Sequence, residues 1–301
     1  MNEIIDDLTI QVKNLQSEVN NLKKESDFIA GDLIFHEPFD TLNLSTWEHA
    51  MTMSGGGNWE FEMYYNNRTN SYVKDSTLFI QPTLTSDIIG DISQDGKKIE
   101  IWGNTPADLC TGNQFFGCER TAYPNDKVIL PPVYSAQLKT ANSFSCKFCR
   151  VEVEAKLPKG DWIWPAIWML PKHLQYGQWP ASGEIDIMES RGNSNLKIDG
   201  SDIGVQCYGA TLNYGPFWPA NGFEKAHKDY CLSSGTFNDE FHKFAVDWRE
   251  DYISFELDGE EILKVDPGKN GFWGLGNFEN DYPGINNPWI TSGSALHYAC
   301  F

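Results

Sequence analysis

From about residue 30 onward, apolar and polar residues alternate with a period of two along much of the chain. Successive side chains of a strand point to opposite faces, so this pattern predicts strands with one buried face. Gly- and Asn-rich turns separate the predicted strands, which are Leu33–Phe35, Trp59–Tyr64, Ser71–Lys74, Thr77–Gln81, Ser135–Lys139, Cys149–Leu157, Tyr208–Leu212, His242–Trp248, Tyr252–Leu257 and Glu261–Val265. Many short strands with little helix predict an all-β sandwich or barrel. The stretch 85–123 lacks the pattern and is expected to be a long surface excursion.

The first 28 residues follow a different period. Apolar residues recur there at alternating intervals of three and four, at Ile5, Leu8, Val12, Leu15, Val19 and Leu22. Heptads with β-branched residues at a and leucine at d predict a coiled-coil helix over 1–28 and a homodimer through residues 5–22. A single amphipathic helix docked on the main domain is the alternative, because three heptads are close to the lower limit for a coiled coil. The segment has no basic start, apolar centre or cleavage site, so it is not a secretory signal peptide.

One stretch breaks the strand alternation and carries the candidate chemistry. Acidic and apolar residues alternate from Glu184 to Ile187, so Glu184 and Asp186 are expected on the same strand face. Like charges on one face repel, so ordinary folding does not favour this arrangement. Glu189 has the opposite parity, and a regular strand would send it into the core. One extra residue at Ile187-Met188, a β-bulge, would return Glu189 to the acidic face.

Three carboxyl groups on one strand face suit glycoside hydrolysis. That reaction needs a nucleophile and a general acid on either side of the glycosidic bond, and a separation of about 5–5.5 Å gives retention of configuration. Asp186 lies between the two glutamates and, hydrogen-bonded to one of them, would separate their pKa values. An accidental cluster on a solvated strand is the alternative, and the apolar and aromatic flanking residues disfavour it.

Tryptophans precede the acidic stretch. Trp162 and Trp164 are predicted to share one strand face, and Trp168 joins them if Pro165 leaves the register unchanged. Aromatic faces of this kind can stack on sugar rings. At least one of the three is nevertheless expected to belong to the core.

Composition excludes several classes of partner. The net charge of −19, with no basic cluster, argues against binding to nucleic acid or to an anionic membrane. No apolar run is long enough to span a membrane. The six histidines show no ligand spacing, and the Asp-rich turns offer no convincing set of Ca²⁺ ligands. We therefore expect no cofactor and no metal.

The chain has seven cysteines, an odd number. Cys110 and Cys118 could close a short loop, and Cys207 with Cys231 is a weaker pairing. Residues i and i+3 of a strand point to opposite sides, which disfavours a metal or redox site at Cys146-Lys-Phe-Cys149. Cys149 is expected to be a small buried residue instead.

The acidic stretch, with Trp164-Pro-Ala-Ile-Trp168 before it, resembles glycoside hydrolase family 16. The likeness is greatest to the branch of endo-β-1,3-glucanases (laminarinases) and animal β-1,3-glucan recognition proteins, whose acidic motif contains the same inserted residue. The resemblance covers roughly residues 31 to 290. It implies a catalytic domain over 31–301 with a β-jelly roll of two curved antiparallel sheets, a cleft on the concave face, and an extracellular location.

The resemblance also implies roles for individual residues. Glu184 matches the family's nucleophile, Glu189 its acid/base and Asp186 its assisting carboxylate. Sugar-stacking residues of the family match Trp164 and Trp168, and a motif near its cleft matches Asn67 and Arg68.

Two departures from the family pattern stand out. After Trp289 the family continues into a strand of the concave sheet and a closing strand, and residues 291–301 match neither. The domain is therefore expected to be C-terminally incomplete. Asn213-Tyr214 stands where laminarinases often carry His-Trp, which affects one contact with the substrate.

The expected function is that of a retaining endo-glycosidase acting on β-1,3-glucan by double displacement. A non-catalytic glucan-binding protein is the first alternative, although members of that kind typically lose the glutamates that this chain keeps. The others are a hydrolase of the same mechanism acting on another polysaccharide, such as a galactan, and a coiled-coil protein with a decayed domain.

Overall fold

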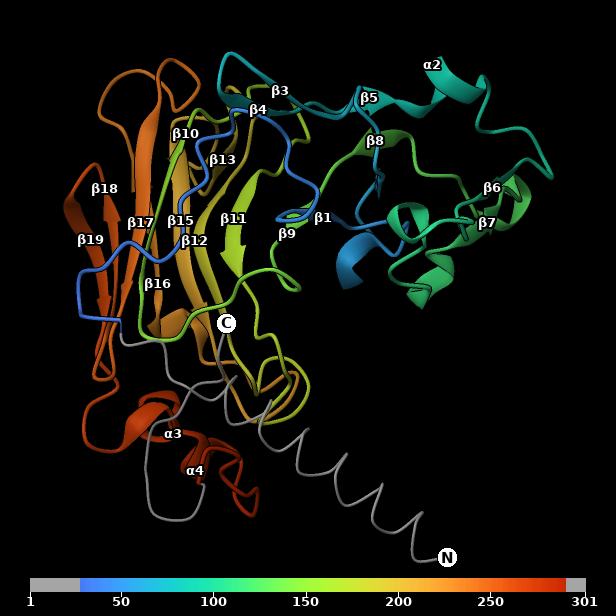
Figure 1. Ribbon diagram of the computed structural model, residues 1–301. Helices are drawn as coiled ribbons and strands as arrows, with labels where there is room; N and C mark the ends of the chain where they lie inside the picture. The colour runs from blue at the N-terminus through green and yellow to red at the C-terminus, as the bar shows by residue number, and fades with distance from the viewer. Residues whose placement is uncertain (1–27, 291–301) are drawn as a thin grey trace, which may run out of the picture. The chain divides into compact units, whose positions relative to one another are not determined.

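The computed structural model describes residues 28–290. They form short strands in mostly antiparallel sheets with a few short helices, which confirms the predicted all-β class (Figure 1). Residues 1–27, with almost all of the predicted coiled coil, and residues 291–301 lie outside the described residues. Within 28–290, no helix has the length and apolar character needed to cross a bilayer. The chain divides into two compact units, Met1–Phe144 and Ser145–Phe301.

The second unit contains two four-stranded antiparallel sheets that pack face to face (Figure 1). The strands of the first sheet, in spatial order, are β11 (Ala166–Met169), β12 (Glu184–Ser190), β15 (Cys207–Asn213) and β16 (His227–Cys231). Those of the second are β10 (Arg150–Ala155), β17 (His242–Trp248), β18 (Ile253–Leu257) and β19 (Glu260–Val265). The smaller elements are β13 (Lys197–Ile198), β14 (Ser201–Asp202), η5 (Phe223–Lys225), α3 (Gly271–Gly276) and α4 (Phe278–Asp281).

The core of the second unit lies between these two sheets. Ile185 and Leu212 of the first sheet are fully buried in one cluster with Phe244 and Phe255 of the second. The period-2 pattern explains this, because every second residue of each strand points to the opposite sheet. The other face of the first sheet is thereby free to carry polar residues.

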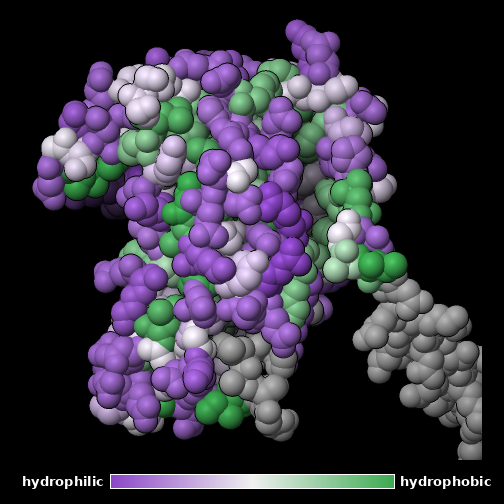
Figure 2. All heavy atoms as spheres, turned by 90° about the vertical axis from the view of Figure 1, so that its left-hand side faces the viewer, coloured by the Kyte–Doolittle hydropathy of each residue, from purple (hydrophilic) through white to green (hydrophobic). Residues whose placement is uncertain are grey.

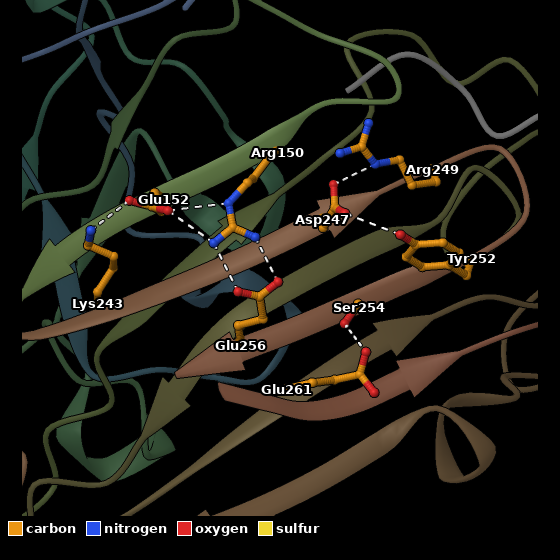
Figure 3. Close-up of polar contacts among 9 residues, drawn as sticks. All are labelled: Arg150, Glu152, Lys243, Asp247, Arg249, Tyr252, Ser254, Glu256 and Glu261. Atoms are coloured by element: carbon orange, nitrogen blue, oxygen red, sulfur yellow. Dashed lines mark hydrogen bonds and ion pairs between the residues drawn. The ribbon is translucent and has the colours of Figure 1, made fainter. Parts of the chain in front are cut away.

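The outer face of the second sheet is a network of cross-strand ion pairs (Figure 3). Two guanidinium nitrogens of Arg150 bind Glu256 at 2.7 and 2.9 Å, and Arg150 also contacts Glu152, which pairs with Lys243. The surface seen from the side of β18 and β19 is largely hydrophilic (Figure 2). Charges of alternating sign in neighbouring strands keep this face polar.

The first unit is built from smaller sheets. Its strands are β1 (Glu48–His49), β2 (Glu62–Tyr64), β3 (Ser71–Lys74), β4 (Thr77–Ile80), β5 (Thr83–Leu84), β6 (Lys98–Glu100), β7 (Glu119–Thr121), β8 (Val133–Ser135) and β9 (Leu138–Lys139). Its helices are η1 (Gly55–Gly57), α2 (Thr85–Ile89), η2 (Pro106–Asp108), η3 (Gln114–Phe116) and η4 (Pro124–Asp126). The strands pair as β1-β9, β2-β8-β5, β3-β4 and β6-β7, and the pair β2-β8 is parallel.

Two predictions for the first unit are wrong. Leu33–Phe35 forms no strand, and Leu33 is exposed. The stretch 85–123 is more than a surface excursion, because β6 and β7 pair within it and Ile99, Ile101 and Ala122 join a buried cluster. Its short strands are separated by long irregular segments, so no alternation long enough to recognise occurs in the sequence.

The six described cysteines form three disulfides. Cys110–Cys118 and Cys207–Cys231 are the pairs considered from the sequence. The third pair, Cys146–Cys149, shows that the expectation for Cys149 as a free buried residue is wrong. The parity argument does not apply there, because β10 begins only at Arg150 and Phe148 has a φ of 54°.

Candidate active site

A β-bulge in β12 brings its three acids to one face. Relative to β15, Asp186 lies opposite Thr211 and Glu189 opposite Gly209, so three residue steps on β12 match two on its neighbour. This confirms the bulge predicted at Ile187-Met188. Both bulge residues are buried in the core side of the sheet, and the acids point to the other side.

Asp186 and Glu184 interact directly. Burial, followed by the charge of Glu184, raises the pKa of Asp186 to about 10. Burial also raises the pKa of Glu184, and its hydrogen bond with Asp186 opposes this rise without cancelling it. Asp186 therefore keeps its proton near neutral pH, and its hydrogen bond to Glu184 favours the ionised form of Glu184. An ionised carboxylate at Glu184 is the form that a nucleophile requires.

Glu189 has a different environment. Burial raises its pKa, and the hydrogen bond from Trp164 is the largest of the effects that lower it. Trp164 Nε1 donates to Glu189 Oε1 at 3.0 Å. The neighbouring charges of Arg191 and His227 act in the same direction as Trp164. The pKa of Glu189 is raised overall, so Glu189 holds a proton at higher pH than an exposed glutamate, as a general acid must.

Two of the three predicted tryptophans, Trp164 and Trp168, lie beside the acids of β12. Trp168 lies directly opposite Asp186 in the register, which puts both side chains on the same face of the sheet. Trp162 has a φ of 68° and precedes β11, so the prediction that it shares a strand face with Trp164 is wrong. The expectation of a core tryptophan is also wrong, because Trp162, Trp164 and Trp168 are 86%, 53% and 39% exposed.

Sequence reasoning missed a second pair of tryptophans. The rings of Trp179 and Trp218 lie 5.4 Å apart, centroid to centroid, and are 37% and 66% exposed. A hydrogen bond with Trp179 lowers the pKa of Glu184, so this pair lies at the Glu184 end of the acid group. Each tryptophan precedes a proline, in Trp179-Pro180 and Trp218-Pro219, and that repetition is the one signal in the sequence.

His227 is a further residue that the sequence did not indicate. Its Nδ1 lies 2.9 Å from Thr211 Oγ1, and its Nε2 lies 3.4 Å from Asp229. The imidazole belongs to β16, two strands away from β12, yet it influences Glu189. The pairing order of the sheet was needed to see this, since nothing local in the sequence links the two residues.

Asn67 and Arg68 lie in the first unit, in the turn before β3. Asn67 Oδ1 accepts a hydrogen bond from the backbone of Thr69 at 2.8 Å. Arg68 Nη2 lies 3.1 Å from Nε2 of His49 and also contacts Asn66. Burial, followed by the charge of Arg68, lowers the pKa of His49 to about 4, so this imidazole is neutral and accepts from the guanidinium.

Across residues 28–290, no group of three or more His, Cys, Asp or Glu residues could hold a metal ion. The acids of β12 instead have amide, indole and carboxyl partners.

Three acids on one strand of a sandwich of antiparallel sheets define the class as a β-sandwich protein with a carboxyl-lined sheet face. Comparison with known proteins agrees: residues 117–275 match the family described as "Glycosyl hydrolases family 16". The chain belongs to glycoside hydrolase family 16, which confirms the resemblance seen in the sequence.

Relatives named for glucan binding include two that cover most of this chain. The "Beta-1,3-glucan-binding protein" of Penaeus monodon is 49% identical over 260 residues, which are 86% of this chain and 68% of the relative. The protein of the same name from Tenebrio molitor is 34% identical over 81% of this chain and 47% of its own length.

A third relative is named as an enzyme. "Glucan endo-1,3-beta-glucosidase A1" of Niallia circulans is 33% identical over 79% of this chain and 30% of its own length. The chain thus spans about two thirds of the Penaeus protein and half or less of the other two.

Solved structures share the fold. The catalytic domain of a laminarinase from Thermotoga petrophila gives a TM-score of 0.56 at 22% identity, over 81% of this chain and 80% of that one. An endo-β-1,3-glucanase from Pyrococcus furiosus gives 0.53 at 25% identity, over 78% and 74%. These neighbours confirm the predicted jelly roll.

Proposed function

We propose that the chain is a retaining endo-glycosidase that hydrolyses β-1,3-glucosidic bonds of glucans. The observation that carries the proposal is the state of the three acids on β12. All three lie on one face of the strand, where the neutral Asp186 hydrogen-bonds to Glu184 and Trp164 donates to Glu189. Double displacement requires two such carboxyl groups, one to attack the sugar and one to protonate the leaving oxygen.

The reaction takes two steps. Glu184 attacks the anomeric carbon and forms a glycosyl-enzyme ester, while Glu189 gives its proton to the leaving oxygen. Glu189, now ionised, removes a proton from water, and the resulting hydroxide displaces Glu184 from the anomeric carbon. Asp186 hydrogen-bonds to Glu184 and stabilises its charge before attack and on release.

Several observations support a glucan substrate in an extracellular setting. Exposed tryptophans stand beside both glutamates, where they can stack on sugar rings. The relatives named above either bind β-1,3-glucan or are endo-1,3-β-glucosidases by name. Three disulfides persist most readily in an oxidising compartment, which supports secretion.

A glucan-binding protein without turnover is the second candidate. The relative at 49% identity, named for glucan binding, favours it. The retained glutamates and their hydrogen bonds with Asp186 and Trp164 favour the enzyme. A hydrolase of another polysaccharide, such as a galactan, would share the same mechanism.

One experiment separates these candidates. Reducing ends released from laminarin, lichenan and agarose are measured for the chain and for Glu184→Gln. We expect release from laminarin that Glu184→Gln abolishes. Binding of laminarin without release of reducing ends supports the recognition protein. Release from agarose alone identifies a different polysaccharide as the substrate. Release that survives Glu184→Gln shows that Glu184 is not the nucleophile.

A further inference from the structure

An amide network links the acids of β12 to the loop after β15, all within the second unit. Asn213 ends β15 opposite Glu184. Its Nδ2 donates to Asp186 Oδ2 at 2.8 Å and lies 3.4 Å from Glu184 Oε1. Its Oδ1 accepts from Nδ2 of Asn221 at 2.7 Å. Asn213 therefore uses both ends of its amide.

The backbone fixes which way these amides point. Asn221 Oδ1 accepts from the backbone N–H groups of Tyr214, at 3.2 Å, and Phe223, at 3.1 Å. A backbone N–H can only donate, so the oxygen of Asn221 must face these groups and its nitrogen must face Asn213. A donor at Asn213 Oδ1 in turn leaves the nitrogen of Asn213 facing the acids.

The loop is closed tightly around this network. Gly222 N donates to the carbonyl of Tyr214 at 2.7 Å. A Cβ on Gly215 would lie 1.8 Å from the carbonyl oxygen of Ala220, and one on Gly222 would lie 2.5 Å from the buried Tyr214 ring. Only glycine allows these approaches, so the loop holds Asn221 in one position.

We propose that Asn221 is a positioning residue that, through Asn213, directs the proton of Asp186 toward Glu184. An Asn213 amide turned by half a rotation would present its oxygen to Asp186 Oδ2, and Asp186 would donate its proton there. With the nitrogen in place, Oδ2 accepts, and the proton belongs to the other oxygen, from which Glu184 can receive it. No bond is made or broken, because only the direction of each hydrogen bond is set.

The kinetic consequence rests on the proposed function, and Asn221→Asp tests it. Aspartate keeps the acceptor for both backbone N–H groups but has no donor for Asn213. We expect kcat on laminarin to fall about tenfold, the scale of one hydrogen bond to a charged group. We expect KM to change little and the acid limb of kcat/KM to move to higher pH, because Glu184 loses support for its ionised form.

Two comparisons separate positioning from a general effect of charge. In an Asn213→Ala background, Asn221→Asp is expected to cause no further loss, because the link is already cut. Asn280→Asp is the matched control, since Asn280 Nδ2 in α4 also donates to an asparagine oxygen, that of Asn277 just before the helix, at 2.7 Å. It is expected to leave kcat and its pH profile unchanged. An equal loss in the Asn213→Ala background would overturn the proposal.

A second readout needs no turnover. The infrared band of the protonated Asp186 carboxyl is identified by its loss in Asp186→Asn. In Asn221→Asp the new carboxylate favours an Asn213 amide turned the other way, so Asp186 Oδ2 loses its donor and we expect the band to shift. Asn213→Ala removes the same donor and serves if Asn221→Asp does not fold. A band that does not move in either variant overturns the proposal. If the chain released no reducing ends, the proposed function would fail while this band still decided the role of Asn221.

Discussion

Asp186 is the most perturbed carboxyl group of the site. It is almost fully buried, and a pKa of about 10 keeps it neutral near pH 7. The unfolded chain binds this proton only below about pH 4, so folding favours the protonated form. The contribution of Asp186 to stability is therefore full below pH 4 and is lost progressively as the pH rises toward 10.

Asp186→Asn is expected to stabilise the protein at pH 7 by about 1 kcal/mol or more, because a single pKa unit is worth 1.36 kcal/mol. The gain should vanish toward pH 4, where aspartate is protonated in both states. Urea unfolding at pH 4, 5.5 and 7 measures it. Asparagine keeps one donor and one acceptor, so Asp186→Asn should also retain more activity than Asp186→Ala. A gain of equal size at all three pH values would contradict the linkage argument.

Trp218 is a residue that the sequence alone did not select. Its ring lies 5.4 Å from that of Trp179, at an interplanar angle of 39°, next to Glu184. We expect Trp218→Ala to raise KM for laminarin about five- to tenfold, the worth of one aromatic contact. Phe241→Ala is the control, because Phe241 is also an exposed aromatic residue of the second unit, at 49%, but precedes β17 of the other sheet. Initial rates on laminarin give both KM values. Equal changes in the two variants would show that stacking at Trp218 is not the cause.

At the scale of the element, β12 shows how one residue changes a strand. Parity alone would have sent Glu189 into the core, and the bulge returns it to the face of Glu184. The sequence was sufficient here, because one extra residue in the strand is the simplest way to bring three acids of mixed parity to one face. Trp162 shows the opposite case: its positive φ ends the regular pattern, and alternation gave no warning of it.

Deletion of Met188 tests the bulge. The remaining Glu-Ile-Asp-Ile-Glu alternates regularly, so all three acids stay on one face and some hydrolysis should remain. The loss of a buried methionine should cost about 2–5 kcal/mol of unfolding free energy. Insertion of an alanine after Ile187 is the matched change: Glu-Ile-Asp-Ile-Ala-Met-Glu also alternates regularly, but it places the last glutamate one residue pair further from Glu184. Hydrolysis should be abolished because the two carboxyl groups are then too far apart for double displacement. Thermal unfolding and laminarin hydrolysis are measured for both. Loss of all activity in a folded deletion variant would contradict the parity argument.

At the scale of the molecule, every disulfide of the described residues lies within one compact unit. Cys207–Cys231 joins paired residues of β15 and β16 in the second unit, and Cys110–Cys118 closes a loop in the first. Both strands of the first pair belong to the sheet that carries the acids. This disulfide therefore bears on the site more directly than the other.

Replacement of Cys207 and Cys231 by serine is expected to lower the unfolding free energy by about 2–4 kcal/mol, since the bond closes a loop of 24 residues. The matched double replacement of Cys110 and Cys118 removes a bond that closes a loop of only 8 residues. It should lower the unfolding free energy by less. Chemical denaturation gives both values. Activity at low temperature should fall further for the Cys207/Cys231 variant, and the reverse order would contradict the assignment of this bond to the site.

The sequence by itself determined the all-β class, the longer strands such as His242–Trp248, and the shared face of the three acids. These depend on local alternation, because successive side chains of a strand point to opposite faces of the sheet. Only the tertiary structure decided what surrounds the acids. Asn221, His227 and Trp218 reach the site from loops and strands distant in the chain, and burial sets which carboxyl holds a proton. Pairing order and burial are properties of the assembled sheets, so no local pattern could predict them.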